Sequence, residues 1–184
     1  MVETTRIALD ALLSADPAAR RASERREFDR LSQGRDLVLM GAGGLGRRAL
    51  AGLRAHGIEP LAFADNRSAG TTVDGVTVLS PGAAAGQFGR RAAFVVTICG
   101  ANSPHRFAHS REQLRALGCD VVCSFPPLFW KYAEELLPFY LQDLPSKVLD
   151  ARAEVRRALD LWEDAASREE YVAQVRLRLA ADFD

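Results

Sequence analysis

A glycine-rich turn carries the residue types and the spacing best suited to binding chemistry. It reads Gly41-Ala42-Gly43-Gly44-Leu45-Gly46 and follows the apolar run 37–40. In such a turn Gly41 permits a tight bend, Gly43 lets the backbone approach a ligand phosphate, and Gly46 lets the next helix pack closely on the strand. Because that helix points free N–H groups over the turn, the pattern predicts an anion site. Arg47 and Arg48 either pair with the phosphates or are solvated.

An acidic residue follows at the position expected for ribose recognition. Asp65 ends the apolar run 61–64 and lies nineteen positions after Gly46. In nucleotide-binding units a carboxylate at this place accepts hydrogen bonds from the ribose hydroxyls. Asn66 either contacts the ligand or stabilises the turn before Arg67. Strand, turn, helix and acid together predict a nucleotide ligand. The alternative is a scaffold in which the glycines serve packing and Asp65 caps a loop.

A second loop is expected to face the glycine turn. It follows the apolar, β-branched run 92–98 and reads Cys99-Gly100-Ala101-Asn102-Ser103. Ligands of open α/β sheets bind beyond the carboxyl ends of the strands, where the strand order reverses. Thr97, Gly100 and Asn102 are therefore further candidates for ligand contact.

Neither a metal centre nor a catalytic constellation is predicted. His105 and His109 have a spacing that can bind metal, but the sequence offers no third ligand and no H-E-x-x-H pattern. Cys119 and Cys123 lie in or beside a strand, without the spacing of a zinc knuckle, and are interpreted as buried small hydrophobic residues. No Ser-His-Asp spacing, no carboxylate pair in an apolar setting and no P-loop lysine is present. We expect the chain to bind a ligand rather than to catalyse a reaction.

The elements around these residues predict an α/β fold. We expect a Rossmann-like three-layer parallel sheet with short N-terminal helices and a C-terminal helical hairpin, divided into residues 1–34, 35–126 and 127–184. In this division the first part packs on the core, the second binds the nucleotide, and the third contains the aromatic segment and the hairpin. The expected strands are the apolar runs 37–40, 61–64, 76–79, 92–98 and 120–125.

Local signals set several boundaries of these elements. Asp16 before Pro17, and Ser80 before Pro81, predict two helix starts. The segment 66–75 shows no helical period, so we expect the second and third strands to be joined without a helix. Pro145 is expected to start one long helix with Val148, Val155, Leu159 and Trp162 on one face, and a capping box at 167–170 is expected to start a second.

Two charged or aromatic stretches have ordinary interpretations. Opposite charges alternate at helical spacing over 20–30, which predicts a solvated face with pairs within the helix. The aromatic residues of 127–140 predict a packing platform, with an interface as the alternative.

The totals exclude some classes of partner. The 184 residues carry 24 basic and 24 acidic side chains, so there is no electrostatic footprint for nucleic acid or an anionic membrane, and self-association is unopposed. Three cysteines are too few for a disulfide framework, and neither a signal peptide nor a long apolar span is found. We expect a cytoplasmic protein without a membrane or nucleic-acid partner.

The motifs resemble a known family. The chain is similar to the N-terminal Rossmann-like domain that precedes the methyltransferase core in many FkbM-type methyltransferases, over segments 41–47, 57–66, 74–81, 94–98, 128–132 and 171–176. The resemblance covers nearly the whole chain. It implies that an S-adenosylmethionine-binding domain with its own glycine turn would follow Asp184. No second turn is present, so we expect an accessory part, truncated or stand-alone, to which methyl transfer and S-adenosylmethionine do not carry over.

The front segment is also similar to the N-terminal domain of bacterial sugar acyltransferases, which holds a nucleotide sugar. That domain shares the short passage between the second and third strands, which favours a nucleotide sugar over NAD(P). Three hypotheses follow. The chain is a nucleotide-binding accessory module with a methyltransferase domain in cis, an enzyme that uses the glycine turn directly as a methyltransferase or an NAD(P)-dependent oxidoreductase, or a scaffold that forms a homodimer without ligand.

Overall fold

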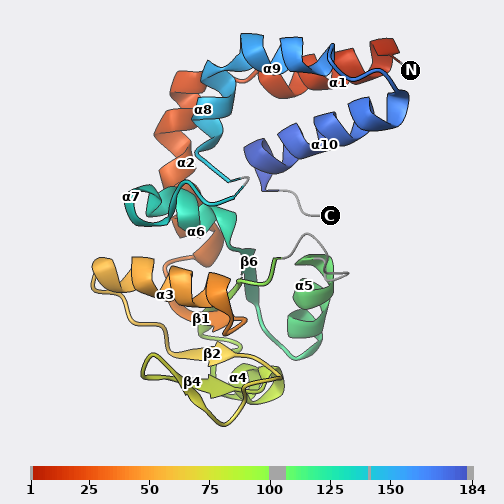
Figure 1. Cartoon of the computed structure of the whole chain (residues 1–184). Helices are drawn as coiled ribbons and strands as arrows, with labels where there is room; N and C mark the ends of the chain where they lie inside the picture. Colours follow the sequence, from red (N-terminus) through yellow and green to blue (C-terminus); the bar gives the residue numbers. More distant parts are fainter. Residues whose placement is uncertain (1, 100–106, 141, 182–184) are drawn as a thin grey trace.

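The computed structural model describes residues 2–99, 107–140 and 142–181. These residues form a six-stranded sheet with helices on both faces and a group of helices at one end (Figure 1). The strand order is β3-β4-β2-β1-β5-β6. The strands are β1 (Asp36–Met40), β2 (Ala62–Ala64), β3 (Thr72–Val73), β4 (Val76–Leu79), β5 (Ala92–Val96) and β6 (Val121–Ser124). The expected α/β fold class is confirmed.

The central strand β1 pairs in parallel with β2 on one side and with β5 on the other. From β1 the chain winds outward to β2 and β4, returns to β5 beside β1, and then continues outward to β6. The strand order therefore reverses between β1 and β5, where open α/β sheets bind their ligands. The sheet departs from the expected all-parallel form at β3, which pairs antiparallel with β4 at the edge.

The two faces of the sheet are covered by different helices. Alternate residues of β1 enter different cores, because successive side chains of a strand point to opposite faces. Leu37 and Leu39 pack with α2 (Pro17–Ser32), α3 (Gly44–Ala55), α6 (Pro126–Lys131) and α7 (Ala133–Leu136). Val38 and Met40 pack with α4 (Pro81–Phe88) and α5 (Phe107–Ala116). The result is a three-layer core.

The passage from β2 to β4 contains no helix, as expected. It is held as a loop by backbone bonds, including Gly70 N–H to Val78 O at 2.9 Å, and by the short β3–β4 hairpin. The predicted helix starts are also found. The Asp16 carboxylate accepts from the N–H groups of Ala18 and Ala19, and the Ser80 hydroxyl accepts from that of Ala83.

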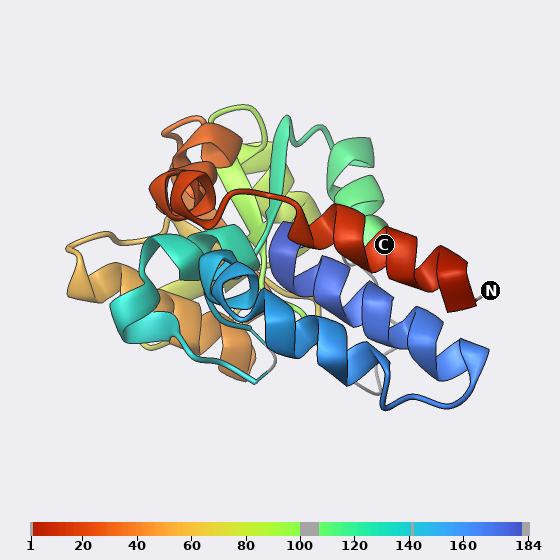
Figure 2. The same cartoon turned by 90° about the horizontal axis from the view of Figure 1, so that it is seen from above.

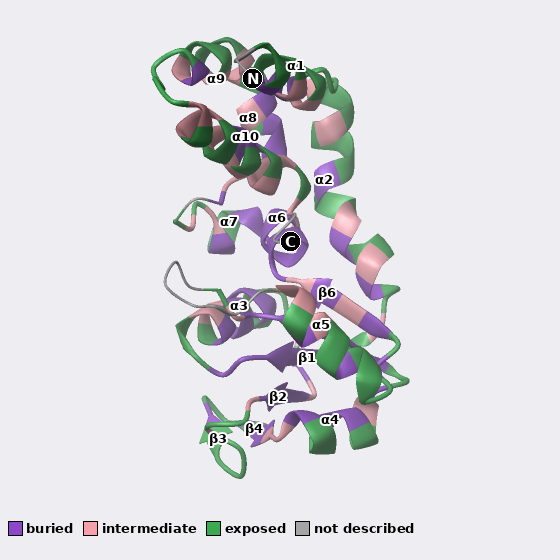
Figure 3. Cartoon of the chain, turned by 90° about the vertical axis from the view of Figure 1, so that its right-hand side faces the viewer, coloured by how far each residue is buried: buried purple, intermediate pink, exposed green. Residues whose placement is uncertain are grey.

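A third core lies at the far end of the molecule from β3 and β4 (Figure 3). It joins α1 (Val2–Leu13), α8 (Pro145–Asp150), α9 (Arg152–Leu159) and α10 (Ala165–Ala180). Seen from above, α1 and α10 lie side by side, and α9 lies along α10 (Figure 2). We expected the N-terminal helices of residues 1–34 to pack on the core that precedes residue 127. The structure differs for α1, whose Leu9 and Leu13 pack in this third core instead.

The charged face of helix α2 is exposed, as its sequence predicts, at Arg21, Arg25, Arg26, Asp29 and Arg30, but several of its ion pairs reach other elements. Its residues pair with other elements, as in Arg21–Asp150 at 2.5 Å and Arg25–Glu134 at 2.7 Å. Glu24 is fully buried and accepts hydrogen bonds from both the backbone N–H and the hydroxyl of Ser146. Glu24 and Phe28 are buried because the opposite face of α2 packs against α6 and α8, which the charge pattern alone does not predict.

The C-terminal hairpin has different boundaries from those expected. The predicted long helix is broken at Ala151 into α8 and α9, and Trp162 is 44% exposed beyond its end. Helix α10 begins at Ala165 because Asp164 caps it by accepting from Ser167 N–H, so the predicted capping box was wrong. The expectation of an aromatic packing platform is borne out at Phe129 and Trp130, which are fully buried.

Within the part of the chain that the structure describes, no helix has both the length and the apolar character needed to cross a membrane.

Candidate functional site

A cleft of about 510 Å³ opens at the carboxyl ends of the central strands. It lies where the strand order reverses, between the loop after β1 and the segment after β5. Its volume falls within the range of ordinary ligand pockets. The lining residues are Met40, Gly41, Gly43, Gly44, Leu45, Ala64, Asp65, Asn66, Arg67, Pro81, Thr97, Ile98, Cys99 and Gln113.

Two glycines of the turn are required by the fold itself. Gly41 has a φ of +109°, and a Cβ there would lie 3.0 Å from Thr97 O. A Cβ on Gly46 would lie 2.0 Å from Gly41 O, which is backbone and cannot move aside. Gly46 therefore lets the first turn of α3 sit directly on the end of β1. Contacts within the protein therefore explain both Gly41 and Gly46 without any ligand.

The other two glycines face open space. A Cβ on Gly43 or on Gly44 would meet no atom of the described residues within 4 Å. Gly43 is the N-cap of α3 and has ordinary extended dihedral angles, φ −78° and ψ −166°. No packing contact within residues 2–99, 107–140 and 142–181 therefore demands a glycine at either place.

The N-terminus of α3 presents donors to the cleft. Within the described residues, none of the backbone N–H groups from Gly43 to Gly46 donates to a protein acceptor. Gly43 supplies no side-chain cap. Such free N–H groups, at the positive end of a twelve-residue helix, favour a bound anion.

Asp65 joins the loop after β2 to the glycine turn. Its Oδ2 accepts from Ala42 N–H at 3.0 Å, and its Oδ1 accepts from the N–H groups of Arg67 at 2.7 Å and Ser68 at 3.2 Å. Burial alone would raise the pKa of this carboxyl, but the hydrogen bonds from Ala42, Arg67 and Ser68 outweigh it and hold the pKa below its ordinary value. The ionised Asp65 carboxylate therefore holds two loops together at the wall of the cleft. The N–H of Ala42 donates to this carboxylate and is not available to a ligand.

The candidates after β5 divide into two groups. Thr97 is buried, and its hydroxyl lies 2.9 Å from Met40 O and 3.0 Å from Gly41 O, so it fastens β5 to the turn. It reaches the cleft as part of the wall. Gly100 and Asn102 lie outside the described residues, as does His105.

Asn66 is exposed in the loop after β2 and lines the cleft.

The two arginines of the first helical turn differ. Arg47 is exposed. Arg48 donates to Leu136 O at 2.9 Å, and its guanidinium lies 5.1 Å from the centre of the Phe139 ring. Arg48 therefore ties α3 to the end of α7 and is half-buried rather than fully solvated, while its contact with a phosphate stays a prediction.

Some lining residues were not among the sequence candidates. Arg67 lines the cleft two positions after Asp65, and its place beside the predicted acid could have marked it. Gln113 reaches the same cleft from α5. No local pattern marks Gln113, because its position depends on how α5 packs against β5.

The buried position expected for Cys119 and Cys123 is confirmed. Cys119 and Cys123 are buried, and burial raises the pKa of each thiol to about 11. Cys99 is exposed at the cleft, with its pKa raised by partial burial. Among residues 2–99, 107–140 and 142–181 no cluster of three metal-binding side chains is found.

Comparison with known proteins shows a similar fold among solved structures. No family model matches the sequence, and no curated protein matches it. Among solved structures, the methyltransferase FkbM from Methylobacillus flagellatus KT is similar, with a TM-score of 0.67 and 17% sequence identity. The match covers 98% of this chain and 48% of that protein, so this chain spans about half its length. At this identity the comparison establishes a shared fold, which extends through the helical end.

Proposed function

We propose that this chain is a nucleotide-binding module that holds the ligand phosphates at the N-terminus of α3. The proposal rests on Gly43 and Gly44, which line the open cleft and have no atom near the position of a Cβ. Their backbone N–H groups have no protein acceptor in the described residues. A phosphate fits this arrangement because it needs several donors and a close approach to the backbone.

Asp65 supplies a second contact for the same ligand. Each carboxylate oxygen has two acceptor positions. Oδ1 already receives two backbone N–H groups, whereas Oδ2 receives one, from Ala42. Since Asp65 lines the cleft, Oδ2 can accept a ribose hydroxyl while it still holds the turn. Asn66 and Arg67 border the same space and can contact the rest of the ligand.

The architecture favours a ligand with one nucleoside, such as a nucleotide sugar, over NAD(P). The second and third parallel strands are joined by a loop without a helix. After β6 the chain continues directly into α6. Its residues Leu128 and Phe129 are fully buried in the core that α3 also joins. In the described residues no further strand extends the sheet to form the second half of a dinucleotide fold.

The family context is part of the proposal. The fold of FkbM from Methylobacillus flagellatus KT matches 98% of this chain within about half of that protein. This supports an accessory role beside an S-adenosylmethionine-dependent methyltransferase domain in cis. S-adenosylmethionine would then belong to that domain, and the ligand of the present cleft would be separate.

Cysteine labelling and thermal shifts test ligand binding directly. Cys99 is exposed at the cleft, whereas Cys119 and Cys123 are buried, so alkylation at slightly alkaline pH should modify Cys99 in the folded protein. The probes are nucleotide sugars, plain nucleotides, NAD, NADP, S-adenosylmethionine and its demethylated product. A true ligand slows Cys99 alkylation, measured by mass spectrometry. At about one hundred times its dissociation constant it adds roughly 2.7 kcal/mol, or roughly 5–10 °C.

Gly43→Val is the decisive variant. The added side chain has room in the empty protein and suits the extended backbone of Gly43, so the melting temperature without ligand should be unchanged. It occupies the place proposed for the phosphate, so ligand protection of Cys99 should be lost. Gly86→Val, in α4 and also facing open space, is the control that should bind normally. Unaltered affinity in Gly43→Val would refute the proposal. If no probe shifts the melting temperature, the scaffold hypothesis is favoured. A shift with S-adenosylmethionine or NAD(P) would favour the enzymatic alternative.

A further inference from the structure

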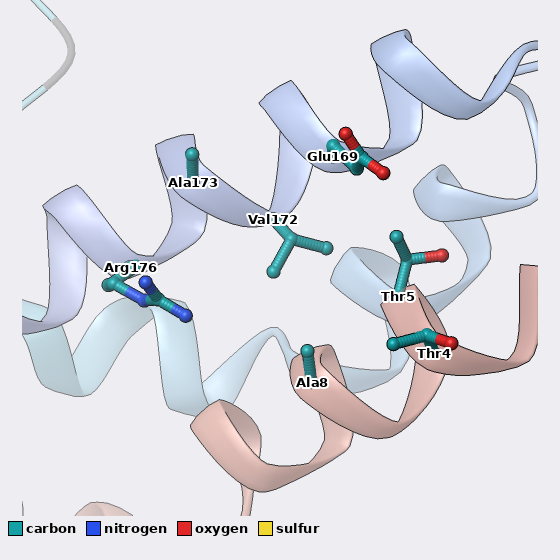
Figure 4. Close-up of a pocket in the computed structure, with 7 residues that line it drawn as sticks. All are labelled: Thr4, Thr5, Ala8, Glu169, Val172, Ala173 and Arg176. Carbon is teal, nitrogen blue, oxygen red and sulfur yellow. The ribbon is translucent and has the colours of Figure 1, made fainter. Parts of the chain in front are cut away.

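A shallow groove runs between α1 and α10, on the helical end of the molecule (Figure 4). Its volume is about 310 Å³. Figure 4 shows Val172 of α10 and Ala8 of α1 in its middle, with Thr4 and Thr5 toward one end. Val172 is buried, whereas Thr4 and Ala173 are exposed. The middle of the groove is therefore small and apolar, and its rim is open to solvent.

Two opposite charges mark the ends of the α10 side of this groove. Glu169 and Arg176 both line it and are both exposed. In the part of the chain that the structure describes, neither side chain forms an ion pair. Seven residues separate them, which is two helical turns and about 10 Å along one face of α10. Their midpoint falls between Val172 and Ala173.

We propose that this face binds a second copy of the same chain, with α10 packed antiparallel on α10 of the partner. A two-fold axis through the midpoint of 169–176 brings Glu169 of each copy against Arg176 of the other. The pair is thus complementary to itself, and the small side chains of Ala8 and Ala173 let the helices approach closely. The zero net charge of the chain adds no long-range repulsion between copies.

Mass measurement over a concentration series is the first test. Sedimentation equilibrium or light scattering of the whole chain should show a monomer–dimer equilibrium. A monomer throughout the series overturns the proposal. This result says nothing about the nucleotide cleft, because the two surfaces lie on different parts of the fold.

Charge reversal then locates the interface. Glu169→Arg places two arginines together across the axis, and Arg176→Glu places two glutamates together, so each should weaken the dimer tenfold or more. Both changes in one chain restore opposite pairs and should recover the dimer. Recovery by the double variant distinguishes a direct Glu169–Arg176 contact from general damage to α10.

Two further variants complete the test. Ala173→Trp adds bulk at the centre of the contact and should also abolish the dimer, without any change in charge. Glu112→Arg and Arg115→Glu, exposed on α5, are the matched controls and should leave it intact. Unchanged circular dichroism and melting behaviour confirm that each variant is folded. A dimer that survives both single reversals, or that the double variant fails to recover, overturns the proposal.

Discussion

Asp65 is a small structural centre in its own right. It holds three backbone N–H groups from two loops, those of Ala42, Arg67 and Ser68. Through Ala42 it fixes the glycine turn, and through Arg67 and Ser68 it fixes the loop that replaces a crossover helix. A contact with a ligand would be added to this role and would not replace it. The same residue can therefore affect stability and binding, and the two effects must be measured separately.

The stabilisation by Asp65 should depend on pH. Its pKa in the folded protein lies below the ordinary value of about 3.9, so the folded state binds this proton less readily than the unfolded state does. The contribution is fully present above about pH 3.9 and is lost as the pH falls through the folded value. At neutral pH, Asp65→Asn should lower the free energy of unfolding by about 1–3 kcal/mol. Urea unfolding of both proteins from pH 7 downward measures the difference.

That difference should shrink toward zero in acid. Asn66→Ala is the control, because it changes the same loop without removing a titratable group, and its effect should not vary with pH. A constant difference between the wild type and Asp65→Asn down to pH 3 would show that the hydrogen bonds do not depend on the ionised carboxylate.

The four glycines of the turn also separate at the level of single residues. Gly41 and Gly46 are explained by contacts within the protein, with a positive φ at the first and a backbone oxygen against the second. Gly43 and Gly44 have no such explanation in the described residues. The sequence motif does not distinguish the four glycines. The contacts show that only Gly43 and Gly44 need a ligand to explain them.

At the level of elements, α2 is the connector between the sheet and the helical end. It packs on α6 and α8, and its buried Glu24 holds the first turn of α8. The carboxylate accepts from Ser146 N–H at 2.8 Å and from the Ser146 hydroxyl at 2.7 Å. Negative charge at a helix N-terminus is favourable, so one side chain both caps α8 and fixes its position.

Removal of this cap should be costly. Glu24→Ala leaves the Ser146 N–H and hydroxyl buried without an acceptor and should reduce the free energy of unfolding by about 2–4 kcal/mol. Urea unfolding of Glu24→Ala, Ser146→Ala and the double variant measures the coupling, which should exceed about 0.5 kcal/mol. Glu154→Ala is the control. Its exposed ion pair with Arg157 should contribute less than about 0.5 kcal/mol. Additive effects of the two changes would contradict a direct cap.

A second connection joins α3 to α7. Arg48 donates to Leu136 O, and Gly52 packs against the Leu136 side chain, where a Cβ would lie 2.6 Å from its Cδ2. The helix whose N-terminus forms the proposed anion site is thereby fixed at its middle to the aromatic segment. This contact helps to fix the position of α3.

At the level of the whole molecule, two cores cover the sheet and a third lies among the helices at one end (Figures 1 and 3). The third core is small. Its buried members are Leu9, Leu13, Leu149, Leu159, Val172 and Val175. Because it shares no residue with the sheet cores, its local stability can differ from theirs.

Leu13→Ala tests this separation. Leu13 is fully buried, so the change should cost about 2–5 kcal/mol in that core. Hydrogen exchange should accelerate in α1, α9 and α10, while the amides of β1 and β5 keep their protection. Ligand binding at the cleft should persist. Uniform acceleration across the sheet would show instead that the helices and the sheet unfold as one cooperative unit.

The sequence by itself determined the elements whose signals are local. The apolar runs predicted the five parallel strands but not β3. Asp16 and Ser80 predicted helix starts, and the segment 66–75, which has no helical period, predicted a helix-free passage between β2 and β4. These features depend on side-chain periodicity and on hydrogen bonds between near neighbours, which a linear pattern records. The spacing of the glycine turn and Asp65 predicted that both belong to one nucleotide-binding unit, and both line the same cleft.

Tertiary structure decided what depends on partners distant in sequence. Glu24 and Arg48 look like solvated helix residues until Ser146 and Leu136 are placed beside them. The sequence of α1 does not show that Leu9 and Leu13 pack against α10, which lies at the other end of the chain. Gln113 enters the cleft only through the packing of α5. The free energies of these contacts arise between segments far apart in the sequence, 122 positions apart for Glu24 and Ser146, so no local pattern of residues contains them.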